Sequence, residues 1–254
     1  MLLTRDNYIN SPSPIEPELK LIFDVKKSLI IFDIGSCEGE DSIKYSRIFP
    51  NSKIFAVEAL PSNQSLIEAN LKAYGAKNIE VLPFALSDED GIADFFISSG
   101  QIEGKQEDQD WDYGNKSSSL LSPEKHLEIV PWLKFQNIIK VTAKTLKNVC
   151  DEKKIRCIDF IHMDVQGAEL KVLKGAKELL KAVKVIWLEV GAVELYKGQP
   201  LKSDVTEFMK KNGFYKLKDT VDDVSGDQLY INKKYIFSSL KALKSFVLIR
   251  YYSL

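Results

Sequence analysis

Cysteine and histidine are scarce in this chain of 254 residues, which contains three cysteines and two histidines. The cysteines, Cys37, Cys150 and Cys157, include no CxxC pair, so neither a disulfide framework nor a cysteine-rich zinc site is predicted. A small number of cysteines with no pairing pattern is typical of proteins in a reducing compartment. We therefore expect a cytoplasmic protein.

The chain also has almost no net charge, because its 35 Lys and Arg residues nearly balance its 36 Asp and Glu residues and leave a formal net charge of −1. This balance provides no general attraction to nucleic acid, and no nucleic-acid partner is predicted. No stretch approaches the ~20 apolar residues that a transmembrane helix needs. The apolar N-terminus is interrupted by Arg5 and Asp6, so no signal peptide is predicted either.

The composition that remains is typical of a folded α/β protein, with 44% hydrophobic and 28% charged residues. Continuous apolar runs, typical of strands buried on both faces of a parallel sheet, occupy residues 28–35, 53–60, 79–86, 158–165 and 185–190. Helices are predicted from residue 40 and over residues 62–74, 169–180 and 203–212, and a final hairpin over residues 214–217 and 228–231. This alternation predicts a doubly wound, mostly parallel sheet with an antiparallel C-terminal hairpin.

The predicted domain comprises residues 28–232; one segment precedes it and another interrupts its alternation of strands and helices. Residues 1–27 are rich in Pro and Ser around their middle and form an irregular lead-in. Residues 93–97 are predicted to pair back on the preceding strand, and residues 98–125 follow as a long polar insertion. A loop of this length in a compact domain is usually functional or disordered, and we predict a lid over the substrate.

A glycine-containing turn, DIGSCEG at residues 33–39, follows the first predicted strand. Glycine lets the backbone turn tightly and approach a ligand at the start of the next helix. The dinucleotide pattern GxGxxG would need glycines where the chain has Cys37 and Glu40, and no P-loop GK[ST] follows. A diphosphate ligand, and with it a nicotinamide oxidoreductase, is therefore disfavoured.

Glu58 ends the second predicted strand, where a carboxylate can accept hydrogen bonds from both hydroxyls of a ribose. Taken alone, the turn at residues 33–39 could bind a ligand or could simply be a tight connection between strand and helix. Together, the turn and Glu58 indicate an adenosine ligand without phosphate, and S-adenosylmethionine fits that description.

Four segments resemble the FkbM family of S-adenosylmethionine-dependent methyltransferases: residues 30–39 (IIFDIGSCEG), 57–63 (VEALPSN), 84–91 (FALSDEDG) and 158–176 (IDFIHMDVQGAELKVLKGA). The last of these is the most specific. The resemblance implies a class I methyltransferase fold, Rossmann-like, over nearly the whole chain, and a reaction that usually methylates oxygen of sugars. By motif match it implies that Asp33, Gly35, Gly39 and Glu58 hold the cofactor and that Ala85 and Leu86 pass near its adenine. The predicted cofactor site also includes Ser36, Cys37 and Asp164.

Sequence absences narrow the acceptor atom. Methyltransferases that act on planar nitrogen often carry an Asn/Asp-Pro-Pro-aromatic sequence after the fourth strand, where this chain has DVQG at residues 164–167. No Pro-Cys nucleophile for cytosine carbon is present. We therefore predict an O-methyltransferase. The resemblance implies a sugar as the acceptor, in a sugar nucleotide or a surface-glycan precursor. A non-sugar small molecule is the alternative acceptor, and a catalytically silent Rossmann-like binding or scaffold protein is the alternative from another class.

Methyl transfer to a hydroxyl needs in-line placement of the reactants and a group that takes the proton. Asp164 ends the fourth strand and is predicted to be catalytic by its position, although it could instead cap the following helix. His126, beyond the insertion, is predicted to be the base because an unperturbed histidine has a pKa of about 6.5, although it could be a solvated loop residue. His162 is predicted to be a core histidine.

Three further residues are predicted to contact the substrate. Glu189 ends the fifth strand beside Asp164, and the two carboxylates could bind Mg²⁺ or anchor sugar hydroxyls. Because carboxylates at strand ends are common, a metal site is not predicted. Trp111 and Tyr113 in the insertion are predicted to stack on a sugar face.

The tail at residues 233–254 is basic and amphipathic. It contains no acidic residue, and its apolar residues Ile236, Leu240, Leu243 and Val247 recur at helical spacing. This pattern predicts docking on the protein's own core or on a second subunit in a homodimer. Peripheral contact with a membrane surface is the alternative.

Overall fold

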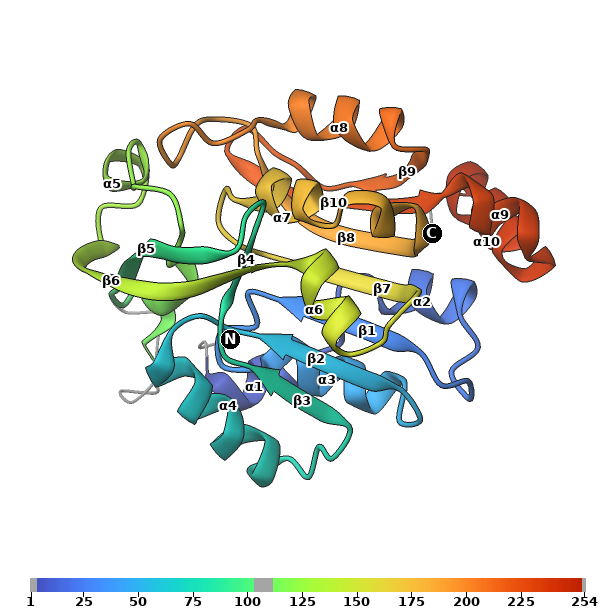
Figure 1. Ribbon diagram of the computed structural model, residues 1–254, viewed down its shortest axis with the longest axis horizontal. Helices are drawn as coiled ribbons and strands as arrows, with labels where there is room; N and C mark the ends of the chain where they lie inside the picture. Colours follow the sequence, from blue (N-terminus) through green and yellow to red (C-terminus); the bar gives the residue numbers. More distant parts are fainter. Residues whose placement is uncertain (1–3, 103–111, 253–254) are drawn as a thin grey trace.

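The computed structural model describes residues 4–102 and 112–252 (Figure 1). Seven strands form a central sheet in the order β3-β2-β1-β7-β8-β10-β9. Their bounds are Ile30–Ile34 (β1), Lys53–Val57 (β2), Ile79–Leu82 (β3), Ile158–Met163 (β7), Val183–Gly191 (β8), Phe214–Asp219 (β9) and Ser225–Asn232 (β10). The first five strands in this order are parallel, and β10 is antiparallel to β8 and β9. The predicted mostly parallel sheet with an antiparallel C-terminal hairpin is confirmed.

Helices cover both faces of this sheet, because neighbouring side chains of a buried strand point to opposite sides. Phe32 of β1 packs in a core cluster with side chains of α6, α7 and α8, whereas Ile31 packs with α2, α3, α9 and α10. The helices are α1 Arg5–Asn10, α2 Glu16–Ile22, α3 Glu40–Ile48, α4 Pro61–Ala73, α5 His126–Ile129, α6 Leu146–Glu152, α7 Glu169–Gly175, α8 Lys202–Lys211, α9 Lys233–Ser238 and α10 Leu240–Tyr252, with short 3-10 helices η1 Tyr113–Ser117 and η2 Lys177–Ala182.

A second, three-stranded sheet lies beside the carboxyl ends of the parallel strands (Figure 1). Its order is β4-β6-β5, with bounds Ala85–Ser87 (β4), Gly91–Ser99 (β5) and Lys134–Thr145 (β6). The prediction of one strand over residues 79–86 is wrong, because the chain leaves the central sheet at Pro83, which has no N–H to donate to a ladder. The prediction that residues 93–97 pair with the preceding strand is also wrong, since β5 pairs with β6.

The segments at the two ends of the chain pack together. The side chains of Ile15, Leu19 and Ile22 are fully buried, so α2 belongs to the core, where the sequence had indicated an irregular lead-in. In α10, the Ser245 hydroxyl donates a hydrogen bond to the Leu21 carbonyl, 2.7 Å away. Within the described parts of the chain, no helix combines the length and apolar character needed to cross a bilayer.

Candidate active site

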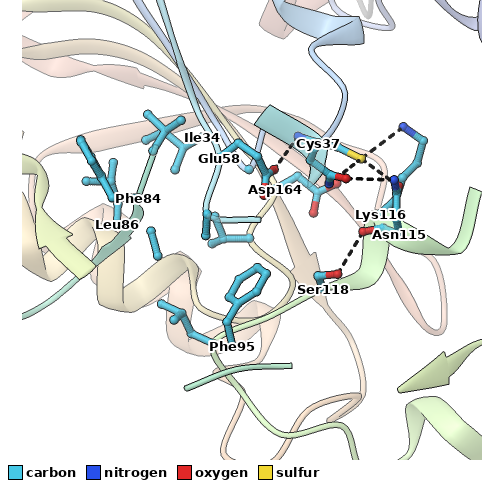
Figure 2. Close-up of a pocket in the computed structure, with 17 residues that line it drawn as sticks. Ile34, Cys37, Glu58, Phe84, Leu86, Phe95, Asn115, Lys116, Ser118 and Asp164 are labelled. Atoms are coloured by element: carbon cyan, nitrogen blue, oxygen red, sulfur yellow. Dashed lines mark hydrogen bonds between the residues drawn. The ribbon is translucent and has the colours of Figure 1, made fainter. Parts of the chain in front are cut away.

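A cavity opens at the carboxyl ends of β1, β2 and β7, where doubly wound sheets bind ligands (Figure 2). It encloses about 510 Å³ that no protein atom fills, part of it open to solvent. Its wall is formed by five parts of the chain: the turn after β1, the end of β2, the connection through β4, the described part of the insertion and the end of β7. The lining residues are Ile34, Gly35, Cys37, Val57, Glu58, Ala59, Asn63, Phe84, Ala85, Leu86, Phe95, Asn115, Lys116, Ser118, Leu120, Asp164 and Val165.

Gly35 permits β1 and β7 to meet at the floor of this cavity. Its φ is +80°, and a Cβ atom placed on it would lie 1.8 Å from the carbonyl oxygen of Asp164. Its backbone N–H donates to the Val57 carbonyl at 3.0 Å, which ties the turn to β2. No other residue type fits this position without moving the end of β7.

Glu58 faces the cavity with its carboxylate already oriented. Oε2 accepts a hydrogen bond from the Cys37 N–H at 2.9 Å, and Oε1 accepts one from the Leu60 N–H at 2.7 Å. Burial raises the pKa of Glu58 to about 7. Each carboxylate oxygen has a second lone pair, so Glu58 can still accept hydrogen bonds from a ligand.

An apolar wall stands beside Glu58. Figure 2 shows Phe84, Leu86 and Phe95 around the same hollow, and Ala85 and Leu120 complete this part of the lining. Ala85 and Leu86, which the resemblance implies lie near the adenine, both line this cavity. Such a surface suits a flat apolar ring.

The insertion packs against the turn after β1 and the start of α3. Asn115 Nδ2 donates to Glu38 Oε1 at 3.1 Å, and Lys116 forms a 2.5 Å ion pair with Glu40. Arg5 of α1 binds the other oxygen of Glu38 at 2.7 Å. The described part of the predicted lid is therefore part of the cavity wall, and the turn is held from two sides.

The side chain of Cys37 in the turn contacts the insertion (Figure 2). Its φ is +49°, and its thiol lies 3.0 Å from Asn115 Oδ1. Burial raises the pKa of this thiol well above its ordinary value, so it remains neutral and can donate to the Asn115 oxygen. The Cys37 side chain thus joins the turn to the insertion.

Asp33 does not line the cavity, although the resemblance implied that it holds the cofactor. Its Oδ1 lies 2.8 Å from His162 Nδ1, and its Oδ2 accepts a 2.5 Å hydrogen bond from the Ser42 hydroxyl. Although burial disfavours the charged imidazole, the hydrogen bond and negative charge of Asp33 outweigh it and raise the pKa of His162 to about 9. Asp33 and His162 therefore form a buried ion pair that joins β1 to β7. Ser36 and Gly39 also lie outside the lining.

Asp164 reaches the cavity from the end of β7, whereas Glu189 lies behind it. Gln166, whose φ is +53°, donates from Nε2 to Asp164 Oδ1 and to Glu189 Oε2, both at 2.7 Å. Burial and the charge of Asp164 raise the pKa of Glu189 well above its ordinary value. An amide group thus stands between the two carboxylates that had suggested Mg²⁺, and no cluster of metal-ligating side chains occurs in the described residues.

His126 lies in a layer behind the cavity rather than in its wall. Its buried ring packs edge-on against Tyr196, with ring centroids 4.9 Å apart, and burial lowers its pKa. The Tyr196 hydroxyl lies 2.8 Å from Gln166 Oε1. The predicted base is therefore separated from the cavity by Tyr196 and Gln166.

The two aromatic residues predicted to contact a sugar have different outcomes. Trp111 lies outside the described residues. Tyr113 starts η1 and lies beside Trp132, with ring centroids 6.4 Å apart, but does not line the cavity. Asn63, Asn115, Lys116 and Ser118 do line it, and the sequence prediction missed them. The polar run GNKSSS at residues 114–119 was the signal that could have identified the last three.

Comparison with known proteins shows which family this chain belongs to. Residues 33–215 match the methyltransferase FkbM domain. The chain belongs to the FkbM methyltransferase family. It is 33% identical over 179 residues to the 2-O-methyltransferase NoeI of Sinorhizobium fredii, and the alignment covers 70% of each chain.

The known structure of the FkbM methyltransferase from Methylobacillus flagellatus has the same fold. It aligns with a TM-score of 0.51 at 14% identity, over 90% of this chain and 50% of that one. The present chain thus spans half the length of that protein. The predicted family and the class I methyltransferase fold are both confirmed, and this FkbM chain is an S-adenosylmethionine-dependent methyltransferase.

Proposed function

We propose that this FkbM methyltransferase transfers a methyl group from S-adenosylmethionine to a hydroxyl oxygen of a sugar. The observation that supports this most is the pairing of two carboxylates in one cavity, Glu58 at the end of β2 and Asp164 at the end of β7 (Figure 2). The first suits a ribose and the second lies where an acceptor hydroxyl could enter. The name of NoeI, a 2-O-methyltransferase, favours oxygen as the acceptor.

The cavity fits the adenosine part of this cofactor. Glu58 would accept hydrogen bonds from the ribose hydroxyls, while Phe84, Ala85 and Leu86 would lie along the adenine. Gly35, which has no side chain, contributes its backbone to the cavity lining. When bound, S-adenosylmethionine supplies an electrophilic methyl group on a sulfonium.

Asp164 is our candidate for the group that binds the acceptor hydroxyl and takes its proton. It lines the cavity, and its Oδ1 accepts a hydrogen bond from the amide of Gln166, which fixes the position of the carboxylate. A carboxylate forms strong hydrogen bonds with sugar hydroxyls. His126 is a weaker candidate than it was from sequence, because its ring is buried behind Tyr196.

The reaction can be tested with purified protein, S-adenosylmethionine and a panel of acceptors. The panel should contain free sugars, sugar nucleotides, oligosaccharides and non-sugar alcohols. We expect S-adenosylhomocysteine to form with a sugar-bearing acceptor, and NMR of the product to show a new O-methyl group. Turnover with the non-sugar alcohols alone, or cofactor binding without turnover on any acceptor, would contradict the proposal.

Replacement of Glu58 by Gln should weaken S-adenosylmethionine binding by ~1.5–3 kcal/mol, because charge-assisted hydrogen bonds to the ribose are lost. Binding to the unmodified protein should also depend on pH. Since the pKa of Glu58 is about 7, affinity should increase as pH rises from about 6 to about 8 and the carboxylate ionises. Calorimetry across this range measures both effects.

The matched control is Glu68→Gln, which makes the same change at an exposed position of α4. It should leave the affinity and its pH dependence unchanged. Equal affinities of the Glu58→Gln and unmodified proteins, with both folded, would remove Glu58 from the cofactor site.

A further inference from the structure

The C-terminal helices expose an unusual amount of apolar surface. Six of the nine large hydrophobic side chains that are exposed among the described residues belong to α9 and α10. Phe237, Leu240 and Tyr251 are 75%, 79% and 73% exposed, respectively. Figure 1 shows these helices at the right-hand end of the molecule, at the opposite end from β4, β5 and β6.

The exposed face of α10 is distinct from the face by which the helix packs on the protein. Ala242 and Ile249 are buried against α2, and the Ser245 hydroxyl binds the Leu21 carbonyl. Leu240, Leu243, Val247 and Tyr251 recur at spacings of three or four residues and form a stripe on the other side. The apolar pattern predicted from sequence is therefore not the docking face: except for Ile236, it points outwards.

Basic residues accompany this stripe. Residues 233–252 contain five basic side chains and no acidic one. By helical position, Lys244 and Arg250 lie at the two edges of the stripe, and Lys241 lies further round the helix. The Lys241 amine donates to the Phe23 carbonyl at 2.6 Å, which places it where α10 meets the body of the protein.

We propose that this face binds the surface of a bilayer that contains anionic lipid. An apolar stripe bordered by Lys and Arg is the pattern by which helices lie in the interface of such a membrane, with apolar side chains among the acyl chains and basic ones near the headgroups. Pairing of this face with its counterpart on a second copy would instead bring like charges together. The charge therefore favours the bilayer over a homodimer.

Flotation of the full chain with lipid vesicles tests this proposal. We expect binding to vesicles of phosphatidylcholine and phosphatidylserine, little binding to phosphatidylcholine alone, and release at high salt, which screens the headgroup charge. The triple variant Leu240→Ser/Val247→Ser/Tyr251→Ser should bind these vesicles at least about tenfold more weakly than the unmodified protein. The variant Lys244→Ser/Arg250→Ser should lose the preference for phosphatidylserine.

The control is Ile92→Ser/Ile138→Ser, which removes two side chains that are 69% and 59% exposed on the second sheet. It should float like the unmodified protein. Absence of binding at low salt, or equal binding by the triple and control variants, would overturn the proposal. The proposal would also be overturned if the unmodified protein did not float and sedimented as a dimer, while the triple variant sedimented as a monomer.

Discussion

Replacement of Asp164 by Asn is expected to lower kcat by about 10²–10⁴-fold, the usual effect of removing a general base. Asn has the same shape and can still accept the hydrogen bond from Gln166, so the fold should be retained. The affinity for S-adenosylhomocysteine, measured by calorimetry, should change little because Glu58 remains. Steady-state kinetics with a saturating acceptor gives the decisive number.

The comparison variant is His126→Phe, which keeps an aromatic ring against Tyr196 and Phe135. This variant should retain turnover, because the His126 ring is buried and does not line the cavity. The opposite pattern, loss of kcat in His126→Phe and normal kcat in Asp164→Asn, would make His126 the base. Normal kcat in both would exclude both residues from proton transfer.

Replacement of Asp33 by Asn is expected to lower the free energy of unfolding by about 3–5 kcal/mol, because a buried histidine charge loses its carboxylate partner. Asp33 is almost completely buried and contacts both His162 and Ser42. Urea denaturation measures the change. The control Asp94→Asn removes one partner of the exposed pair with Lys140 and should cost less than ~1 kcal/mol.

This stabilisation should depend on pH in a defined direction. Folding raises the pKa of His162 from the ordinary 6.5 to about 9. The contribution of the ion pair is therefore complete below pH 6.5 and is lost as pH rises through about 9. The gap between the unmodified protein and Asp33→Asn should narrow between about pH 6 and about pH 10. A gap that is constant over this range would show that Asp33 stabilises by hydrogen bonding alone.

Motif matching did not separate cofactor-site residues from the residues that support them. Glu58, Gly35 and Asp164 line the cavity, whereas Asp33 in the same motif supports the sheet beneath it. In a strand the direction of a side chain alternates, so positions that are close in sequence can face a ligand or the core. The motif therefore indicated the end of the sheet at which the cavity opens, without assigning a role to each of its residues.

The sequence by itself determined the central sheet, its antiparallel hairpin, the family and the location of the cavity, because these depend on local patterns. Apolar runs specify buried strands, and a glycine-containing turn specifies a close backbone approach within a few residues. What only the tertiary structure decided are contacts between distant segments: Asn115 on Glu38, Tyr196 against both His126 and Gln166, and β5 on β6. The same holds for the outward face of α10, since a helix with apolar residues on several sides has more than one face that could pack on the core. Such contacts depend on which surfaces meet when the chain folds, and sequence spacing does not encode that choice.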